Sequence, residues 1–271
     1  MKTRAITGLF FVLVMLASIL GGAEFFTLFY ISLSLICLIE FFGLVKTTGI
    51  KPQRTIAYII AVFLFIGISA NHFFDFESKW LLLIILPIIG VFIAELYKKS
   101  TQPFTNIAYT FLGLIYTQTP FLFFFSISFI SGTYNPHLAL GFFLLLWAND
   151  TGAYLFGVKL GKNRLFERHS PKKSWEGFFG GIFTSLLVSL LLAHYFTDYA
   201  LQHWGAMAII ISCFGTFGDL VESMFKRSIN IKDSGKILPG HGGVLDRFDG
   251  LLLSAPIVFL YLYLINISNF A

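Results

Sequence analysis

Charge is scarce in this chain, and so is cysteine. Only 12% of the 271 residues are Asp, Glu, Lys or Arg, whereas 56% are apolar and 34 are Phe. A mean hydropathy of +0.80 excludes an ordinary soluble domain. The two cysteines, Cys37 and Cys213, stand apart within apolar runs, which argues against a disulfide or a zinc site. The composition is therefore that of a membrane protein.

Long apolar runs predict the fold class, because about 18 or more such residues suffice for a membrane-spanning helix. Nine runs are present, at 4–21, 24–45, 55–74, 79–97, 104–130, 136–157, 177–197, 204–225 and 248–268. The first run predicts a span and not a cleaved signal peptide, since the second follows at once. Pro120 predicts a kink or tilt in the fifth. We therefore expect an all-α, polytopic integral membrane protein.

Basic residues gather in alternate loops. The N-terminus and the loops after the second, fourth, sixth and eighth predicted spans hold 18 of the 19 Lys and Arg, and the other side holds only Lys79. By the positive-inside rule the basic side is cytoplasmic. We therefore expect the N-terminus inside and the C-terminus outside. Binding of nucleic acid is not expected, because these residues lie in short loops flush with the bilayer.

The two halves of the chain differ in character. Residues 1–135 predict a scaffold with few interior polar groups, and residues 136–271 predict a catalytic region with cytoplasmic loops at 158–176 and 226–247. Glu40 is the exception in the first half; it is either a functional interior group or a hydrogen-bonded packing residue. Glu95, at the end of its span, is expected to reach the interface.

The charges that do occur are concentrated. Ten lie between Gly218 and Gly250, and eight more between Lys159 and Glu176. Asp219, Glu222 and Lys226 are spaced to share one helix face, with Ser223 beside them. Such groups at the ends of apolar helices are costly and usually functional.

A second carboxylate pair, Asp246 and Asp249, begins the last predicted helix. Two pairs of carboxylates suit a divalent cation such as Mg²⁺. The candidate metal ligands are Asp219, Glu222, Asp246 and Asp249. The alternative is a purely structural set of salt bridges, which would not need the neighbouring glycines.

Anion-binding groups accompany the carboxylates. Gly242 and Gly243 make a flexible corner before a helix, where N–H groups can hold a phosphate. His241 beside them either contacts a phosphate or hydrogen-bonds the loop. Lys172 and Lys173 either bind phosphates or are interfacial lysines at a capped helix start. The sequence offers no plausible Ser-His-Asp or Cys-His pair, so phosphoryl or nucleotidyl transfer at a lipid interface is the predicted chemistry.

The stretch S-x-x-K-R-x4-K-D-x-G-x2-L-P-x-H-G-G-x2-D-R-x-D, from Ser223 to Asp249, resembles the signature of the phosphatidate cytidylyltransferases, also called CDP-diglyceride synthases. WANDTGAY from Trp147 and SPKKSWEG from Ser170 are similar to that family as well. The resemblance implies that CTP and phosphatidate give CDP-diacylglycerol and pyrophosphate. It also implies Mg²⁺ with a second cation, a homodimer, and contact with membrane lipids. The compact form predicts a bacterial plasma (inner) membrane, with the active site facing the cytoplasm.

On this hypothesis the residues divide into two groups. Those expected to act on the phosphates during transfer are Asp219, Lys226, Asp246, Arg247 and Asp249. Those expected to bind CTP or the lipid headgroup, or to line the cavity, are Asn149, Asp150, Lys172, Lys173, Ser223, Arg227, Lys232, His241, Gly242 and Gly243.

Two other functions remain as alternatives. A CTP-dependent lipid kinase of the dolichol or phytol type would use the same nucleotide but transfer its γ-phosphate to an alcohol. A transporter would use intramembrane acids such as Glu40 and Asp150 as an ion path. The sequence favours neither, because the full signature points to cytidylyl transfer and the polar groups crowd one face of the membrane.

Overall fold

The computed structural model describes residues 2–74, 76–231, 234–235 and 242–268. It is helical, apart from one short hairpin, and its contacts divide it into two compact units. Unit 1 comprises Met1–Phe125 and Asp233–Leu245, and unit 2 comprises Ser126–Lys232 and Asp246–Ala271. Residues 234–235 and 242–245 are therefore packed with the N-terminal helices, although they are distant from them in the sequence.

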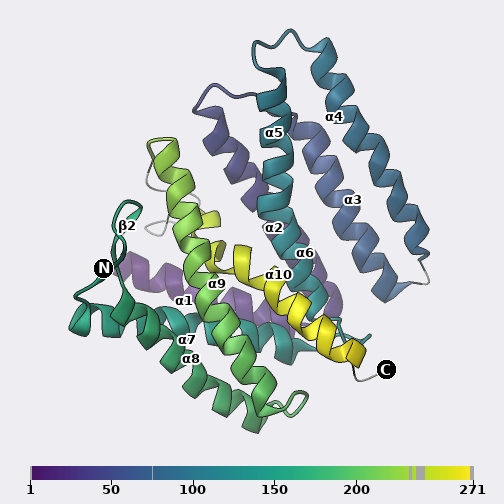
Figure 1. Cartoon of the computed structure of the whole chain (residues 1–271). Coiled ribbons are helices and arrows are strands. Elements are labelled where there is room, and N and C mark those ends of the chain that lie inside the picture. The colour runs from purple at the N-terminus through teal and green to yellow at the C-terminus, as the bar shows by residue number, and fades with distance from the viewer. Residues whose placement is uncertain (1, 75, 232–233, 236–241, 269–271) are drawn as a thin grey trace. The chain divides into compact units, whose positions relative to one another are not determined.

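Unit 1 is built from antiparallel helices joined by short turns. Its elements are α1 (Lys2–Leu20), α2 (Ala23–Lys46), α3 (Arg54–Phe73), the 3₁₀ helix η1 (Ser78–Ile84), α4 (Ile85–Tyr97), α5 (Pro103–Gly113), the π-helical turn η2 (Leu114–Gln118) and α6 (Thr119–Ile127), whose last two residues belong to unit 2. Figure 1 shows α3 alongside α4, and α2 packs against both α1 and α3. Gly49, with a φ of 83°, and Pro52 end α2 and set the turn into α3.

Aromatic packing forms the core of unit 1. Phe26 and Tyr30 of α2 contact Phe124 of α6, with ring centroids 6.0 and 5.0 Å away, and Phe65 of α3 meets Phe125 edge-on at 5.3 Å. All five rings are almost completely buried. In a bilayer such close packing, and not exclusion from water, holds helices together.

The predicted kink at Pro120 takes the form of a π-helical turn. Proline has no N–H and its ring collides with the preceding turn, so a regular α-helix cannot continue through it. The chain widens over Leu114–Gln118, immediately before Pro120, and α6 then resumes at Thr119. Irregular backbone of this kind is tolerated within a span where protein covers it.

Unit 2 contains α7 (Pro136–Leu160), the strands β1 (Arg164–Phe166) and β2 (Ser170–Ser174), α8 (Trp175–Tyr195), α9 (Leu201–Ser228) and α10 (Leu245–Ser268), whose first residue belongs to unit 1. Small residues allow α7, α8 and α9 to approach closely. The Thr184 hydroxyl of α8 donates to the Ala148 carbonyl of α7 at 2.9 Å, and Gly141 of α7 lies directly against Trp204 of α9. Figure 1 shows α7 and α8 side by side.

Eight helical segments among the described residues are long and apolar enough to cross a membrane. They correspond to the second through ninth predicted spans, whereas the described apolar part of α1, Thr7–Leu20, is shorter. The helical, integral-membrane class is thus confirmed. The hairpin was not predicted, because its strands are short and polar. The functional division at residues 135 and 136 stays a prediction.

Candidate active site

Three carboxylates from two helices of unit 2 gather at one point. Oxygens of Asp219 and Glu222 on α9 and of Asp249 on α10 all lie within 4.8 Å of one another. The spacing i, i+3 places the first two on one face of α9, as expected. Asp249 is held on the first turns of α10, where its own Oδ1 accepts from the Gly250 N–H at 2.7 Å.

Lys226 joins this group to the fourth carboxylate. Its ammonium lies 3.1 Å from Glu222 Oε2 and 2.6 Å from Asp246 Oδ1, and its side chain is only 12% exposed. The structure therefore places Asp246 with Lys226, and not within the three-carboxylate group. A lysine fixed in this way carries a positive charge toward any phosphate that enters.

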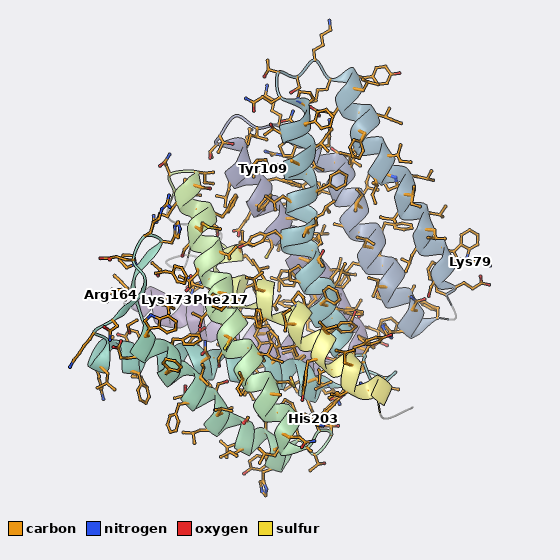
Figure 2. All side chains as sticks on the ribbon, viewed as in Figure 1. Lys79, Tyr109, Arg164, Lys173, His203 and Phe217 are labelled. Atoms are coloured by element: carbon orange, nitrogen blue, oxygen red, sulfur yellow. The ribbon has the colours of Figure 1, made fainter. Side chains whose placement is uncertain are left out.

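A second lysine approaches from the hairpin. Lys173 on β2 forms a 2.5 Å ion pair with Asp219, and Figure 2 shows it on the hairpin that precedes α8. The hairpin holds it there, since β1 and β2 pair Arg164 with Ser174. Ser174 also caps α8, its hydroxyl accepting from the Gly177 N–H at 3.2 Å. The motif is thus both a capped helix start and the support of a lysine at the carboxylates.

Glycines bring the two carboxylate-bearing helices together. A Cβ on Gly218 would collide with the Asp249 carbonyl, and one on Gly250 would meet Leu146 of α7. Because Gly218 has no room for a side chain, α9 and α10 approach at backbone distance, and Gly250 in turn makes room for α7. This close approach lets short Asp side chains from both helices reach one point.

The donor set fits a hard divalent cation. Mg²⁺ takes carboxylate oxygens together with water and substrate phosphates. Glu222 Oε1 is buried and has no hydrogen-bond partner in the described part of the chain. A buried carboxylate oxygen without a donor is costly, and a cation among Asp219, Glu222 and Asp249 would satisfy it.

Further predicted residues lie around the cluster. Asp150 on α7 interacts electrostatically with Lys173, Asp219 and Arg247. Its neighbour Asn149 is buried, and Asn149 Oδ1 has no partner among the described residues. Ser223 donates to Asp219 Oδ1 at 3.3 Å. These residues therefore lie beside the carboxylates, and the cavity that they were predicted to line stays a prediction.

Other predicted residues lie elsewhere. Lys172 is exposed on the hairpin, and exposed Arg227 donates to the Ile231 carbonyl at 3.2 Å. Lys232 and His241 lie outside the described residues. Gly242, with a φ of 84°, and Gly243 belong to unit 1.

Glu40 has a role that the sequence left open. Its carboxylate accepts the N–H groups of Val244 at 3.0 Å and Leu245 at 2.7 Å, although more than 200 residues separate them. It therefore caps the start of α10, where backbone N–H groups have no helical partner. Gly235 and Gly243 pack against it with no room for a Cβ. Sequence spacing gave no signal for this link, nor for the pairing of Lys173 with Asp219.

Comparison with known proteins places the chain in a family. The family profile described as "Cytidylyltransferase family" matches residues 2–265. The phosphatidate cytidylyltransferase of Staphylococcus aureus (strain COL) is 38% identical over 265 residues, which cover 95% of this chain and 97% of that protein. Enzymes of the same name from Staphylococcus haemolyticus (strain JCSC1435) and Staphylococcus epidermidis (strain ATCC 12228 / FDA PCI 1200) are 34% and 33% identical over 261 residues, covering the same shares. The matched residues reach from the first helix to the last and so span both units, and the chain therefore belongs to the cytidylyltransferase family.

Proposed function

We propose that this chain transfers the cytidylyl group of CTP to the phosphate of phosphatidate, forming CDP-diacylglycerol and releasing pyrophosphate. The observation that carries the proposal is the likeness along almost the whole chain to phosphatidate cytidylyltransferases, joined to a carboxylate and lysine cluster suited to phosphate chemistry. Such reactions depend on positioning and on charge neutralisation.

The chemistry needs no general base from the protein. Phosphatidate already carries an anionic phosphate, whose oxygen forms the new bond to the α-phosphorus of CTP while the bond to the β-phosphate breaks. The obstacle is repulsion between two anionic groups. This explains why the site has lysines and carboxylates and uses no histidine pair.

Each residue of the cluster has a proposed task. Asp219, Glu222 and Asp249 would hold Mg²⁺, which when bound neutralises the charge on the CTP phosphates. Lys226, oriented by Glu222 and Asp246, holds a phosphate and stabilises the leaving pyrophosphate. Lys173 holds a second phosphate at the mouth of the cluster. Arg247, Asp150 and Asn149 line the same region.

The orientation in the membrane, the cellular location and the oligomeric state are also part of the proposal. We place nine spans in the membrane, α1 included, with the N-terminus and the active site cytoplasmic and the C-terminus outside, because basic residues gather on one side. The membrane would be a bacterial plasma membrane, and the working form a homodimer with a second cation beside Mg²⁺. Phosphate contacts by Lys172, Arg227, Lys232, His241, Gly242 and Gly243 also stay predictions.

Labelled CTP tests the reaction. The purified protein is incubated with phosphatidate, Mg²⁺ and CTP that carries label on either the α- or the γ-phosphate. We expect α-label to enter the lipid and pyrophosphate to be released. In a parallel reaction with a long-chain lipid alcohol in place of phosphatidate, entry of γ-label into the lipid would instead identify a kinase. If folded protein transfers neither label, uptake by proteoliposomes is the next measurement, because a transporter would then be the remaining candidate.

A further inference from the structure

A cavity of about 370 Å³ lies in unit 1, and it shares no residue and no helix with the carboxylate cluster. It is formed where α2 and α4 end and α3 and α5 begin. Its lining residues are Thr48, Gly49, Lys51, Lys98, Lys99, Ser100, Thr101, Gln102 and Asn106. Three lysines and five hydroxyl or amide side chains thus surround a space within the usual size range of small-ligand sites, about 300–1,000 Å³.

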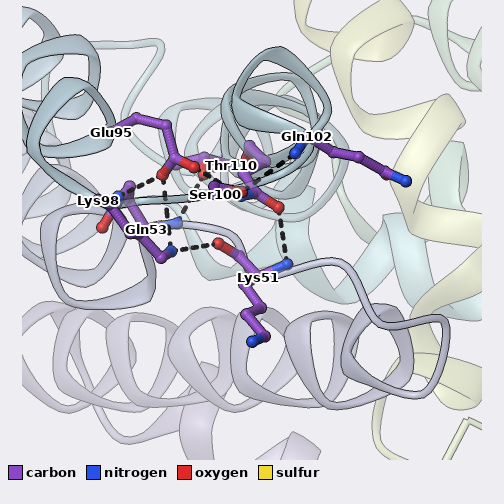
Figure 3. Close-up of polar contacts among 8 residues, drawn as sticks. Lys51, Gln53, Glu95, Lys98, Ser100, Gln102 and Thr110 are labelled. Carbon is purple, nitrogen blue, oxygen red and sulfur yellow. Dashed lines mark hydrogen bonds and ion pairs between the residues drawn. The ribbon is translucent and has the colours of Figure 1, made fainter.

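Buried side chains fix the two loops that form this cavity (Figure 3). Glu95, expected at the interface, is only 2% exposed and accepts from Gln53 Nε2 at 2.5 Å and Asn106 Nδ2 at 2.6 Å. Asn106 Oδ1 accepts the Lys51 N–H at 2.8 Å, and Thr110 Oγ1 accepts the Gln53 N–H at 2.9 Å. The loop backbone is therefore held by side chains from α4 and α5, so the cavity is a built feature.

The cavity has an excess of positive charge. Lys98 donates to the Lys51 carbonyl at 2.7 Å and lies 3.6 Å from Glu95, so one ammonium faces the only carboxylate of the network. Lys51 and Lys99 are exposed, and neither belongs to an ion pair in the described part of the chain. Figure 3 shows the Lys51 side chain pointing away from the network. Two ammonium groups are thus left to meet an anion.

The start of α5 adds to this charge. Its N-cap residue, Gln102, makes no side-chain cap, and Pro103 occupies the first turn. The N-terminus of a helix carries a partial positive charge and N–H groups that favour an anion. The cavity therefore combines ammonium groups, hydroxyls and a helix start, which together recognise a phosphate.

We propose that this cavity binds the phosphate of an anionic phospholipid headgroup, at a site separate from the carboxylate cluster. The helices that form it all belong to candidate membrane spans, and each has one of its two ends at the cavity. This places the cavity at the depth of lipid headgroups. Next to it in the chain, α3 carries an apolar groove of about 640 Å³ that is lined by side chains from Thr55 to Ala70 and by Phe76. That groove offers a path for acyl chains, which a free phosphate would not need. The proposal does not rest on the reaction proposed above.

Thermal unfolding in neutral detergent tests this site. The probes are dioctanoyl phosphatidylglycerol, dioctanoyl phosphatidylcholine and inorganic phosphate, at one ionic strength. The variants are Lys51→Gln, Lys99→Gln and the two combined. Their side chains are exposed and only the backbone of Lys51 enters the network, so folding is retained. Lys46→Gln is the matched control, since Lys46 is an exposed lysine at the end of α2 that does not line the cavity.

We expect phosphatidylglycerol to raise the unfolding temperature of the wild type and of Lys46→Gln, and phosphatidylcholine to have no such effect. The double variant should lose at least half of that rise, and each single variant a part of it. An undiminished rise in the double variant, or no rise in the wild type, would overturn the proposal. If inorganic phosphate raises the unfolding temperature equally and the double variant loses that rise, the cavity binds free phosphate, and the proposal of a lipid site is overturned.

Discussion

At the scale of single residues, the carboxylate and lysine cluster of unit 2 has more negative than positive charge. Asp219, Glu222, Asp246 and Asp249 face two ammonium groups, those of Lys173 and Lys226. Carboxylates that are close together and partly buried repel each other strongly. The arrangement is stable only if a cation or protons reduce that charge, which is the physical reason to expect a metal there.

Asp249→Asn should therefore abolish most of the activity without unfolding the protein. The amide keeps the size of the carboxylate but removes one of the three charges that would hold a cation. Losing one such electrostatic contact costs on the order of 10²–10³ in turnover. The measurement is transfer of α-label from CTP to lipid over a range of Mg²⁺ concentrations.

Asp198→Asn is the control for this change. Asp198, in the loop before α9, pairs with His137 of α7 and is partly exposed. Its replacement removes the charge of a carboxylate of unit 2 that lies outside the cluster. It should leave transfer unchanged. Full activity in folded Asp249→Asn would show that Asp249 is not a required metal ligand.

At the scale of elements, the close crossing of α9 and α10 decides whether the carboxylates meet. Gly218→Ala inserts a methyl group against the Asp249 carbonyl, so the helices must separate. Overpacking of this kind costs about 1–3 kcal/mol. We expect a lower unfolding temperature together with a loss of cytidylyl transfer.

Gly205→Ala is the matched control on the same helix. Nothing lies within 4 Å of a Cβ at Gly205, so alanine there fits without strain. It should leave activity intact and raise stability slightly, because alanine is the better helix former. Equal behaviour of the two variants would show that the close crossing is not required.

Glu40 tests whether the start of α10 depends on a distant helix. In Glu40→Gln the amide oxygen can still accept one of the two backbone N–H groups, but the amide NH₂ faces the second. One charge-assisted hydrogen bond is therefore lost, and one backbone donor is left unpaired. The expected cost is about 1–3 kcal/mol of unfolding free energy. Because Asp246 directly follows Leu245, transfer should fall as well.

Glu24→Gln makes the same chemical change on the same helix at an exposed position. Thermal unfolding of both variants in detergent separates a general charge effect from the loss of the cap. If Glu40→Gln unfolds at the same temperature as Glu24→Gln and the wild type, the cap contributes no stability.

These elements show what periodicity can predict and what it cannot. Helical spacing placed Asp219, Glu222 and Lys226 on one face, because that relation is local. The bond from Glu40 to Leu245 joins residues more than 200 positions apart, and no local pattern encodes it. The strand Ser170–Ser174 is polar and carries a proline, so nothing in it resembles a strand until its pairing with Arg164–Phe166 is seen.

At the scale of the whole molecule, apolar run length predicted eight segments that the structure shows as candidate spans. Run length is reliable because a bilayer forces every backbone polar group into a helix. It gives no sign of how the spans pack, since lipid-facing and buried surfaces are equally apolar here. Phe10 is largely exposed, for example, whereas Phe26 is completely buried.

Orientation in the membrane follows from charge and can be tested directly. The loop around Ser100 has lysines beside it and should be cytoplasmic, whereas the loop around Thr133 lacks them and should be outside. Both natural cysteines lie within spans, so Ser100→Cys and Thr133→Cys can be compared in intact cells with a membrane-impermeant thiol reagent. We expect Thr133→Cys to be labelled and Ser100→Cys to be labelled only after the cells are opened. The reverse pattern would put the lysine-rich loops outside, away from cytoplasmic CTP, and could not be reconciled with the proposed reaction.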